Sequence, residues 1–354
     1  MKQEGIKMNN LNVLNLDDNK WDEIVKSFKD YDVYYLSGYV KGFYLHGDGE
    51  PMLFYYEEDG LKAINVVMKR DIASDIRFKD KIEKEKYFDL STPYGYGGWL
   101  IEGDKDLDNL LNEYDNWCRE NNIISEVIRF HPILKNQERL RNHYEIMDLG
   151  KTIAIDTSDE ETVWANFTTQ NRAKIKKAKN FGVEIDHKID LETIEEFKKI
   201  YEVTMNKDNA EDYYYFDNSF YNSIMNDLKD ISDIFYATFE GKMVASTIVL
   251  KCNKKLTYHF SGVLTDYRYL QATNLMLYEV GLWGARNGYK TFHLGGGVGS
   301  KEDNLYEFKK SFNKKESYQY SIGKRIFNKD LYDKLVSLRK DEELRDNYFP
   351  LYRA

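Results

Sequence analysis

A glycine-rich loop, Gly295–Gly299, is the clearest candidate for a ligand-binding segment in the sequence. Glycine lets the backbone approach a ligand closely, so Gly295 and Gly296 are candidate binding residues. The loop does not fit a Walker A phosphate loop, because Ser300 precedes the lysine and Glu302 follows it. It also lacks the third glycine of a dinucleotide-binding loop, which disfavours a nucleotide-dependent oxidoreductase. Two interpretations remain, a loop beside a substrate site and an exposed surface loop.

Histidines and tyrosines on predicted strands could act as acids, bases or hydrogen-bond donors. Tyr258 and His259 lie on one such strand, whose alternation places Tyr258 and Ser261 on opposite faces. Arg129 and His131 lie at the end of another strand, a favourable place for a site. Each histidine is a candidate general base, although strand histidines more often serve the fold.

Two further stretches could bind an aromatic or anionic ligand. The loop over 91–98 combines three glycines with Tyr94 and Tyr96, which either face a ligand or cover an edge of the core. The segment Arg172–Lys179 holds five basic residues and no acidic one. Arg172 and Lys176 could therefore bind a phosphate group or an RNA backbone, and a solvated helix face is the alternative.

The elements that position these residues alternate between strands and helices. After a polar lead-in over 1–20, we expect a helix over 21–28 and strands over 33–35, 42–45, 52–57 and 62–68, with a hairpin turn at Asp59-Gly60. Further helices are expected over 107–121, 164–179, 191–201, 220–228, 274–286 and 329–338, and further strands over 126–130, 152–155, 183–186, 234–240, 242–250, 255–261, 290–294 and 317–322.

One pattern occurs twice in the chain. Glu113, Trp117 and Asn121 have the same spacing as Glu279, Trp283 and Asn287, and each set lies in a predicted helix that leads into a strand. The repetition suggests two copies of one structural unit.

A helix ending in WGARNGY, a strand FHLGG and the segment FKKSF follow one another in the second half of the chain. This order resembles the FemABX-like branch of the GNAT acyltransferase superfamily, including its BioF2-like members. The resemblance implies an α/β fold, an α+β mixed sheet, of two tandem GNAT-like domains. We expect a degenerate N-terminal domain over 1–150 and an acyltransferase domain over 151–354.

The resemblance also implies roles for individual residues. The lysine of the family's FK motif lies at the acyl-transfer centre, which assigns catalysis to Lys309 with Phe308 beside it. A fixed ammonium can stabilise the oxyanion of acyl transfer while the acceptor amine attacks directly. The family's substrate-contacting tyrosine corresponds to Tyr258. Its basic residue for a nucleotide-sugar precursor is replaced here by Lys207.

A GNAT domain binds the pyrophosphate of its donor where this chain has Arg268–Asn274. Arg268, Gln271, Thr273 and Asn274 are therefore candidate cofactor-binding residues. Gln271 and Thr273 stand where glycines would let backbone amides approach a phosphate. This difference disfavours acyl-CoA as the donor and leaves aminoacyl-tRNA or a less usual thioester open, with no tightly bound cofactor.

Composition narrows the function classes further. The net charge of −9 argues against a generic nucleic-acid-binding protein. Two cysteines, Cys118 and Cys252, are too few for a disulfide framework, and no metal-ligand spacing occurs. No signal peptide or membrane span is recognisable, so a cytoplasmic protein is expected.

The sequence therefore predicts an enzyme that moves an acyl or aminoacyl group to an amine near Lys309. The acceptor would be a small-molecule or nucleotide-linked amine, such as a cell-envelope (peptidoglycan) precursor or an amino sugar, with tRNA as a candidate partner. The alternative is a non-catalytic module that binds a nucleotide-sugar or a peptide.

Overall fold

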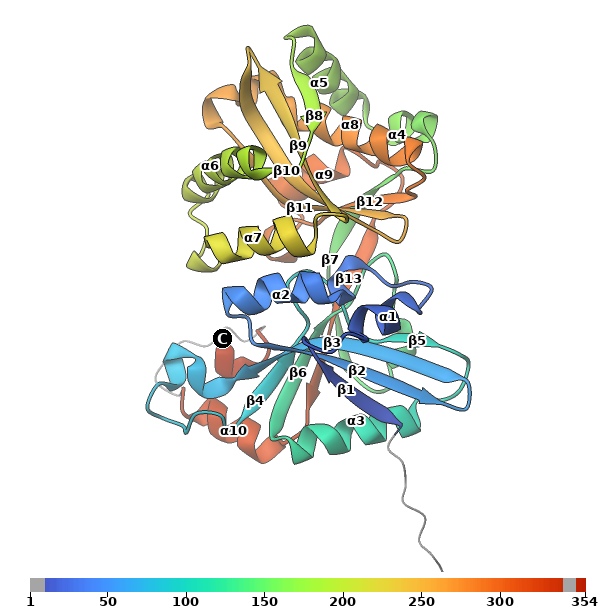
Figure 1. Ribbon diagram of the computed structural model, residues 1–354, viewed down its shortest axis with the longest axis vertical. Coiled ribbons are helices and arrows are strands. Elements are labelled where there is room, and N and C mark those ends of the chain that lie inside the picture. Colours follow the sequence, from blue (N-terminus) through green and yellow to red (C-terminus); the bar gives the residue numbers. More distant parts are fainter. Residues whose placement is uncertain (1–9, 340–347) are drawn as a thin grey trace, which may run out of the picture. The chain divides into compact units, whose positions relative to one another are not determined.

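The computed structural model describes residues 10–339 and 348–354 (Figure 1). The chain divides into two compact units. Unit 1 comprises Met1–Asp148 and Ser321–Ala354, and unit 2 comprises Leu149–Tyr320. The lead-in expected over 1–20 lies partly outside the described residues, over 1–9. Its later part contains strand β1 (Leu11–Asn15), which pairs with β2.

Unit 1 is built on a mixed sheet in the order β1-β2-β3-β4-β6-β13, with β5 paired to β3. Strands β4 and β6 are parallel, and the other pairs are antiparallel. The strands after β1 are β2 (Glu50–Glu58), β3 (Leu61–Asp71), β4 (Phe88–Ser91), β5 (Leu100–Glu102), β6 (Ile123–Arg129) and β13 (Tyr318–Ile326). The predicted hairpin turn between β2 and β3 is confirmed, because Asp59 and Gly60 both have positive φ, 48° and 83°.

The helices of unit 1 are α1 (Trp21–Lys26), α2 (Ser37–His46), α3 (Asp108–Glu120) and α10 (Lys329–Ser337). The strands expected over 33–35 and 42–45 are wrong. These residues form a short 3₁₀ turn, η1 (Val33–Tyr35), and part of α2. Tyr39, Val40 and Phe43 are buried at the spacing of a helix face, so packing outweighs the strand preference of valine and aromatic residues.

Unit 2 carries strands in the order β7-β12-β11-β10-β9-β8, of which β11 and β12 are parallel. The strands are β7 (Glu145–Asp156), which begins in unit 1, β8 (Glu184–His187), β9 (Ser232–Phe239), β10 (Lys242–Cys252), β11 (Lys255–Val263) and β12 (Thr291–Gly295). The helices are α4 (Glu160–Asn166), α5 (Thr169–Asn180), α6 (Leu191–Lys207), α7 (Asn218–Asp227), α8 (Ala272–Arg286) and α9 (Asn304–Lys310). The helix predicted over 164–179 is two helices, because α4 ends before Thr168 caps α5.

The repeated sequence pattern has a structural counterpart in each unit. Helix α3 lies in the connection between the parallel strands β4 and β6, and α8 connects the parallel strands β11 and β12. Parallel neighbours need such a crossover, which is usually helical. In each unit the repeated Glu and Trp lie in the helix, and the repeated Asn follows its last residue, before the second parallel strand.

The end of the chain differs from the predicted domain division. Ser321–Ala354 belong to unit 1, although the sequence assigned 151–354 to the second domain. The reason is that β13 pairs with β6, and that Tyr352 is buried in unit 1. The Tyr352 hydroxyl donates to Asp89 at 2.9 Å, and the Arg353 Nε donates to the same carboxylate at 2.6 Å.

Each unit has its own hydrophobic core. The core of unit 2 gathers side chains of α5 and α8 against β7, β10 and β12. The core of unit 1 packs α3 against β2, β3 and β6. Within the described ranges, no helix is both long enough and apolar enough to cross a membrane.

Candidate active site

The sheet of unit 2 parts between its two parallel strands. The last residue pair that joins β11 to β12 is Thr257 with His293. Beyond it, β11 runs on to Val263 beside β10, while β12 runs on to Gly295 beside β7. The backbone groups on the parted edges are thereby released from the sheet and can meet a ligand. The glycine loop, predicted to lie beside a substrate site, follows β12 at this opening.

A β-bulge lies on β11 where the strands part. Tyr258 and Phe260 face consecutive residues of β10, so His259 is an extra residue in β11. A bulge shifts the alternation of faces by one position. Tyr258 and Ser261 therefore share a face, and the Tyr258 hydroxyl donates to the Ser261 hydroxyl. The expectation that these two side chains lie on opposite faces is wrong, because simple alternation does not include the bulge.

Burial sets the protonation of both predicted residues on this strand. It raises the pKa of Tyr258 to about 12, against the opposing effect of the Ser261 hydrogen bond. It lowers the pKa of His259 to about 3. Tyr258 is thus a neutral hydroxyl and His259 a neutral imidazole near pH 7. A base as weak as His259 is poorly matched to general-base catalysis, so its candidate role is contact with a substrate.

The glycine loop follows β12 and approaches other backbone closely. Gly295 has a φ of +77°, which favours glycine. A Cβ on Gly296 would lie 2.8 Å from the carbonyl oxygen of Lys151. A Cβ on Gly297 would lie 2.3 Å from a carboxylate oxygen of Asp303. Close packing therefore requires glycine at Gly296 and Gly297, and it holds this part of the loop in place.

Lys309 reaches this loop from α9. Its side chain is 8% exposed, and its Nζ donates to the carbonyl oxygen of Gly296 at 2.7 Å. Burial lowers the pKa of Lys309 to about 8, and the nearby Asp303 opposes that decrease. Phe308 is partly buried and packs edge-on against Phe312 in the core. The structure thus joins Lys309 and Gly296, two residues predicted separately from the sequence.

The predicted donor-binding turn lies before α8. Arg268 is exposed on a 3₁₀ turn, η6 (Thr265–Leu270), and Gln271 follows with a φ of 57°. Gln271 thus adopts the left-handed conformation in which glycine is usual. Thr273 lies in the first turn of α8, whose backbone amides can bind a phosphate. Asn274 is buried: its side-chain amide donates to Asn171 at 2.8 Å, and its backbone amide donates to the Gln271 carbonyl oxygen at 3.1 Å. These bonds favour a structural role for Asn274.

Two exposed rings lie near this turn. Phe181, at the end of α5, and Tyr269, on η6, are 40% and 51% exposed. Their ring centroids are 5.7 Å apart, and the Lys177 ammonium lies 5.5 Å from the Phe181 ring centroid. Together with Arg268, these side chains give the turn a surface that is both aromatic and basic.

The comparisons with known proteins agree with this geometry. Residues 165–310 match the acetyltransferase (GNAT) domain family, and the matched range lies within unit 2 and includes Lys309. This segment is a GNAT domain. No curated protein sequence matches the chain.

Solved structures extend the likeness to both units. FemX has a TM-score of 0.66 at 14% identity, over 91% of this chain and 99% of FemX. L-PGS from Bacillus licheniformis has a TM-score of 0.57 at 12% identity, over 92% of this chain and 97% of its own. The C-terminal domain of a lysylphosphatidylglycerol synthetase from Agrobacterium fabrum has a TM-score of 0.55 at 12% identity, over 85% and 90%. At these identities the likeness shows a shared fold alone.

Three predicted basic residues of the GNAT domain, Arg172, Lys176 and Lys207, lie on α5 and α6. Arg172 donates to the carbonyl oxygen of Phe167 at 2.9 Å and to that of Ala165 at 3.3 Å. Its guanidinium therefore closes the C-terminal end of α4. Lys176 is exposed on α5, and Lys207 is exposed at the end of α6. A role for these basic residues in substrate binding stays a prediction.

The predicted tyrosines of unit 1 pack against other rings. The Tyr94 ring stacks on Phe43 with 5.3 Å between centroids. The Tyr96 ring lies 5.6 Å from Tyr34, edge to face. Both side chains remain partly exposed. They cover the edge of an aromatic cluster and keep surface that a ligand could contact.

Arg129 and His131 are bonded within unit 1. The His131 Nε2 lies 2.9 Å from an oxygen of Asp32, and its Nδ1 accepts from the backbone amide of Ile133 at 3.2 Å. The acceptor role of Nδ1 places the proton on Nε2, so this buried histidine is held by the fold. Arg129 donates to the carbonyl oxygen of Thr92 at 2.9 Å. These contacts favour the structural interpretation of both side chains.

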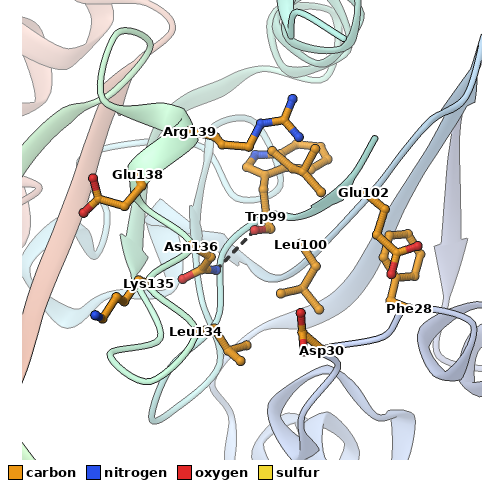
Figure 2. A pocket seen from close by; sticks show the side chains of 11 residues that line it. Phe28, Asp30, Trp99, Leu100, Glu102, Leu134, Lys135, Asn136, Glu138 and Arg139 are labelled. Atoms are coloured by element: carbon orange, nitrogen blue, oxygen red, sulfur yellow. Dashed lines mark hydrogen bonds between the residues drawn. The ribbon is translucent and has the colours of Figure 1, made fainter. Parts of the chain in front are cut away.

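Unit 1 also contains a pocket of about 250 Å³ that the sequence did not indicate (Figure 2). Its lining comes from three separate segments, over 28–30, 99–102 and 134–139. The Asn136 amide donates to the carbonyl oxygen of Trp99 at 3.2 Å, drawn as a dashed line in Figure 2. Arg139 donates to two backbone carbonyl oxygens, and Glu138 pairs with Arg141 at 3.0 Å. Much of the polar lining is thus already bonded within the protein.

Two residues of the GNAT domain were missed by sequence reasoning. Ser261 became part of the site only through the bulge in β11. Asp303 caps α9 and contacts the glycine loop. An aspartate directly before a helix is a recognisable cap signal. Its contact with the loop depends on tertiary structure.

Proposed function

We propose that the GNAT domain transfers an acyl or aminoacyl group from an activated donor to an amine, where β11 and β12 part. The observation that supports this most is the buried Lys309 ammonium on the carbonyl oxygen of Gly296. It lies within the segment that matches the GNAT family. A buried cation beside parted strands provides the charge that acyl transfer needs.

The reaction would proceed by direct attack. The neutral acceptor amine adds to the donor carbonyl, and the carbonyl electron pair moves onto oxygen. The Lys309 ammonium stabilises this oxyanion, because a fixed positive charge in a water-poor site interacts strongly with developing negative charge. Collapse re-forms the carbonyl and expels the donor's alkoxide or thiolate. The new amide loses the proton that came from the amine, and the leaving group takes up one proton.

The donor would enter from the turn before α8. Arg268 and the first backbone amides of α8 would hold its phosphate groups. The exposed rings of Phe181 and Tyr269 would contact a flat group on the same donor. Acyl-CoA and aminoacyl-tRNA both carry phosphates and an adenine. The side chains of Gln271 and Thr273 crowd a compact pyrophosphate, which favours aminoacyl-tRNA.

The acceptor would be an amine on a cell-envelope precursor or an amino sugar. Tyr258, a neutral hydroxyl bonded to Ser261, is the candidate for contact with this acceptor. The resemblance of the sequence to FemABX-like enzymes and the FemX-like fold support this choice of acceptor.

The test is a transfer assay with each donor and a panel of UDP-linked peptidoglycan precursors and amino sugars. Product should form with one donor class, and kcat/KM should fall above pH about 8 as the free enzyme loses the Lys309 proton. Lys309→Met should lose at least 100-fold in kcat, the typical value for one oxyanion-stabilising group. Lys229→Met, which changes an exposed lysine after α7, is the matched control. Unchanged turnover in Lys309→Met would contradict the proposal.

A further inference from the structure

Asp303 uses its two carboxylate oxygens for different elements. One oxygen accepts from the backbone amide of Tyr306 at 2.9 Å and caps α9. The other accepts from the backbone amide of Val298 at 3.0 Å, within the glycine-rich segment. A single side chain therefore fixes the start of the helix and the loop that precedes it.

Two other aspartate caps in unit 2 contact the residues before their helices through side chains and not through a backbone amide: Asp190 pairs with Lys188 at 2.7 Å, and Asp159 accepts from the Ser158 hydroxyl at 3.5 Å. Asp190 caps α6 with one oxygen, which accepts from the amide and the hydroxyl of Thr193. Asp159 caps α4 and binds both polar groups of Thr162. The contact between Asp303 and Val298 is thus additional to ordinary helix capping.

The glycine loop lies close to the Asp303 carboxylate. A Cβ on Gly297 would lie 2.1 Å from the Lys301 carbonyl oxygen and 2.3 Å from the Asp303 Oδ1, so only glycine fits at this position. The neighbouring Gly296 carbonyl is held by the Lys309 Nζ at 2.7 Å. Helix α9 therefore holds the loop from its cap and from its last turn.

The Asp303 carboxylate also raises the pKa of Lys309. Hydrogen bonds from backbone amides, that of Tyr306 foremost, keep the pKa of Asp303 below its usual range. The resulting negative charge opposes the effect of burial on Lys309. Asp303 thus favours the ammonium form without lying against it as an ion-pair partner.

We propose that Asp303 is a positioning residue, which fixes the glycine loop against α9 and so holds the Gly296 carbonyl oxygen at the Lys309 ammonium. The kinetic consequence rests on the proposed acyltransferase function. The positional role does not, because it concerns the contacts of Val298, Gly296 and Lys309 in the protein alone.

The test is Asp303→Asn. Asparagine keeps one carbonyl oxygen and remains a good helix cap, but its NH₂ group cannot accept from the Val298 amide. The change also removes the charge. We expect the pKa of Lys309, followed by NMR of the lysine side chains and assigned with Lys309→Met, to fall below its wild-type value. We also expect severalfold faster hydrogen exchange at the Val298 amide.

Asp190→Asn is the matched control, since it changes a cap that does not contact the loop, and it should leave both measurements unchanged. If Asp303→Asn does not fold, Asp303→Ser retains a capping oxygen and permits the same measurements. The proposal is overturned if the folded variant keeps the wild-type Lys309 pKa and Val298 exchange.

The kinetic measurement separates the two proposals. In Asp303→Asn the alkaline fall of kcat/KM should begin at a lower pH than in wild type. If the pKa and exchange change as expected while wild type transfers no acyl group, Asp303 is a positioning residue and the proposed function is wrong.

Discussion

Replacing Lys309 with methionine should change how the stability of the protein depends on pH. Lys309 has a pKa of about 8 in the folded protein, against 10.5 for a lysine in an unfolded chain. Between these pH values the unfolded state holds more protons than the folded state. Raising the pH therefore favours the folded state, and the ammonium form lowers the free energy of unfolding below pH 8.

The magnitude follows from the pKa difference. A shift of this size corresponds to about 3 kcal/mol over the full titration. Between pH 7 and pH 10, wild type should gain roughly 2 to 3 kcal/mol that Lys309→Met does not gain. Other titrating groups are common to both proteins, so their contributions cancel in the difference.

The assay is urea unfolding at pH 7, 8, 9 and 10, followed by tryptophan fluorescence and converted to free energies by linear extrapolation. Lys229→Met is the control, because an exposed lysine should show no such difference from wild type. A difference between wild type and Lys309→Met that stays constant from pH 7 to pH 10 would refute the reasoning. The ammonium would then be solvated, and its proposed effect on an oxyanion would lose its basis.

Two further substitutions test the packing around these elements. Gly262→Ala places a Cβ 2.6 Å from the carbonyl oxygen of Ile200 in α6, so we expect a loss of about 2 kcal/mol in urea unfolding; a loss below 0.5 kcal/mol would show that α6 moves freely. Asp89→Asn removes a buried charge that Arg353 contacts at 2.6 Å, so we expect a loss of about 3 kcal/mol, and wild-type stability would contradict it.

The glycine loop and Lys309 could be located from sequence because both are local signals. A run of glycines requires close backbone contact, and the FKKSF segment carried the family resemblance. Their joining by a hydrogen bond could not be derived from either signal. It depends on α9, a short helix whose position is set by the packing of Phe312 and Tyr306 in the core.

The arrangement of strands was only partly predictable. The hairpin at Asp59-Gly60 follows from two residues that accept positive φ. The bulge at His259 has no such signal, because each residue in that strand also suits regular alternation. The change of faces from Tyr258 to Ser261 therefore required the structure.

The end of the chain was misassigned for a related reason. The sequence predicts a strand and a helix over 317–338, but a strand pattern does not show with which other strand it will pair. β13 returns to β6, and Tyr352 enters a network with Asp89 and Ser125. Such long-range pairing depends on edges and networks that no local window contains.

The charge on Lys309 is informative because it is only partly compensated. If Lys309 were buried for packing alone, the protein would be more stable with methionine at this position, because burial of the ammonium costs free energy at neutral pH. A carboxylate placed directly against Lys309 would lower that cost, but it would also cancel the field that an oxyanion needs. Asp303 instead binds two backbone amides. Its charge raises the pKa of Lys309 and leaves the ammonium available for the proposed oxyanion.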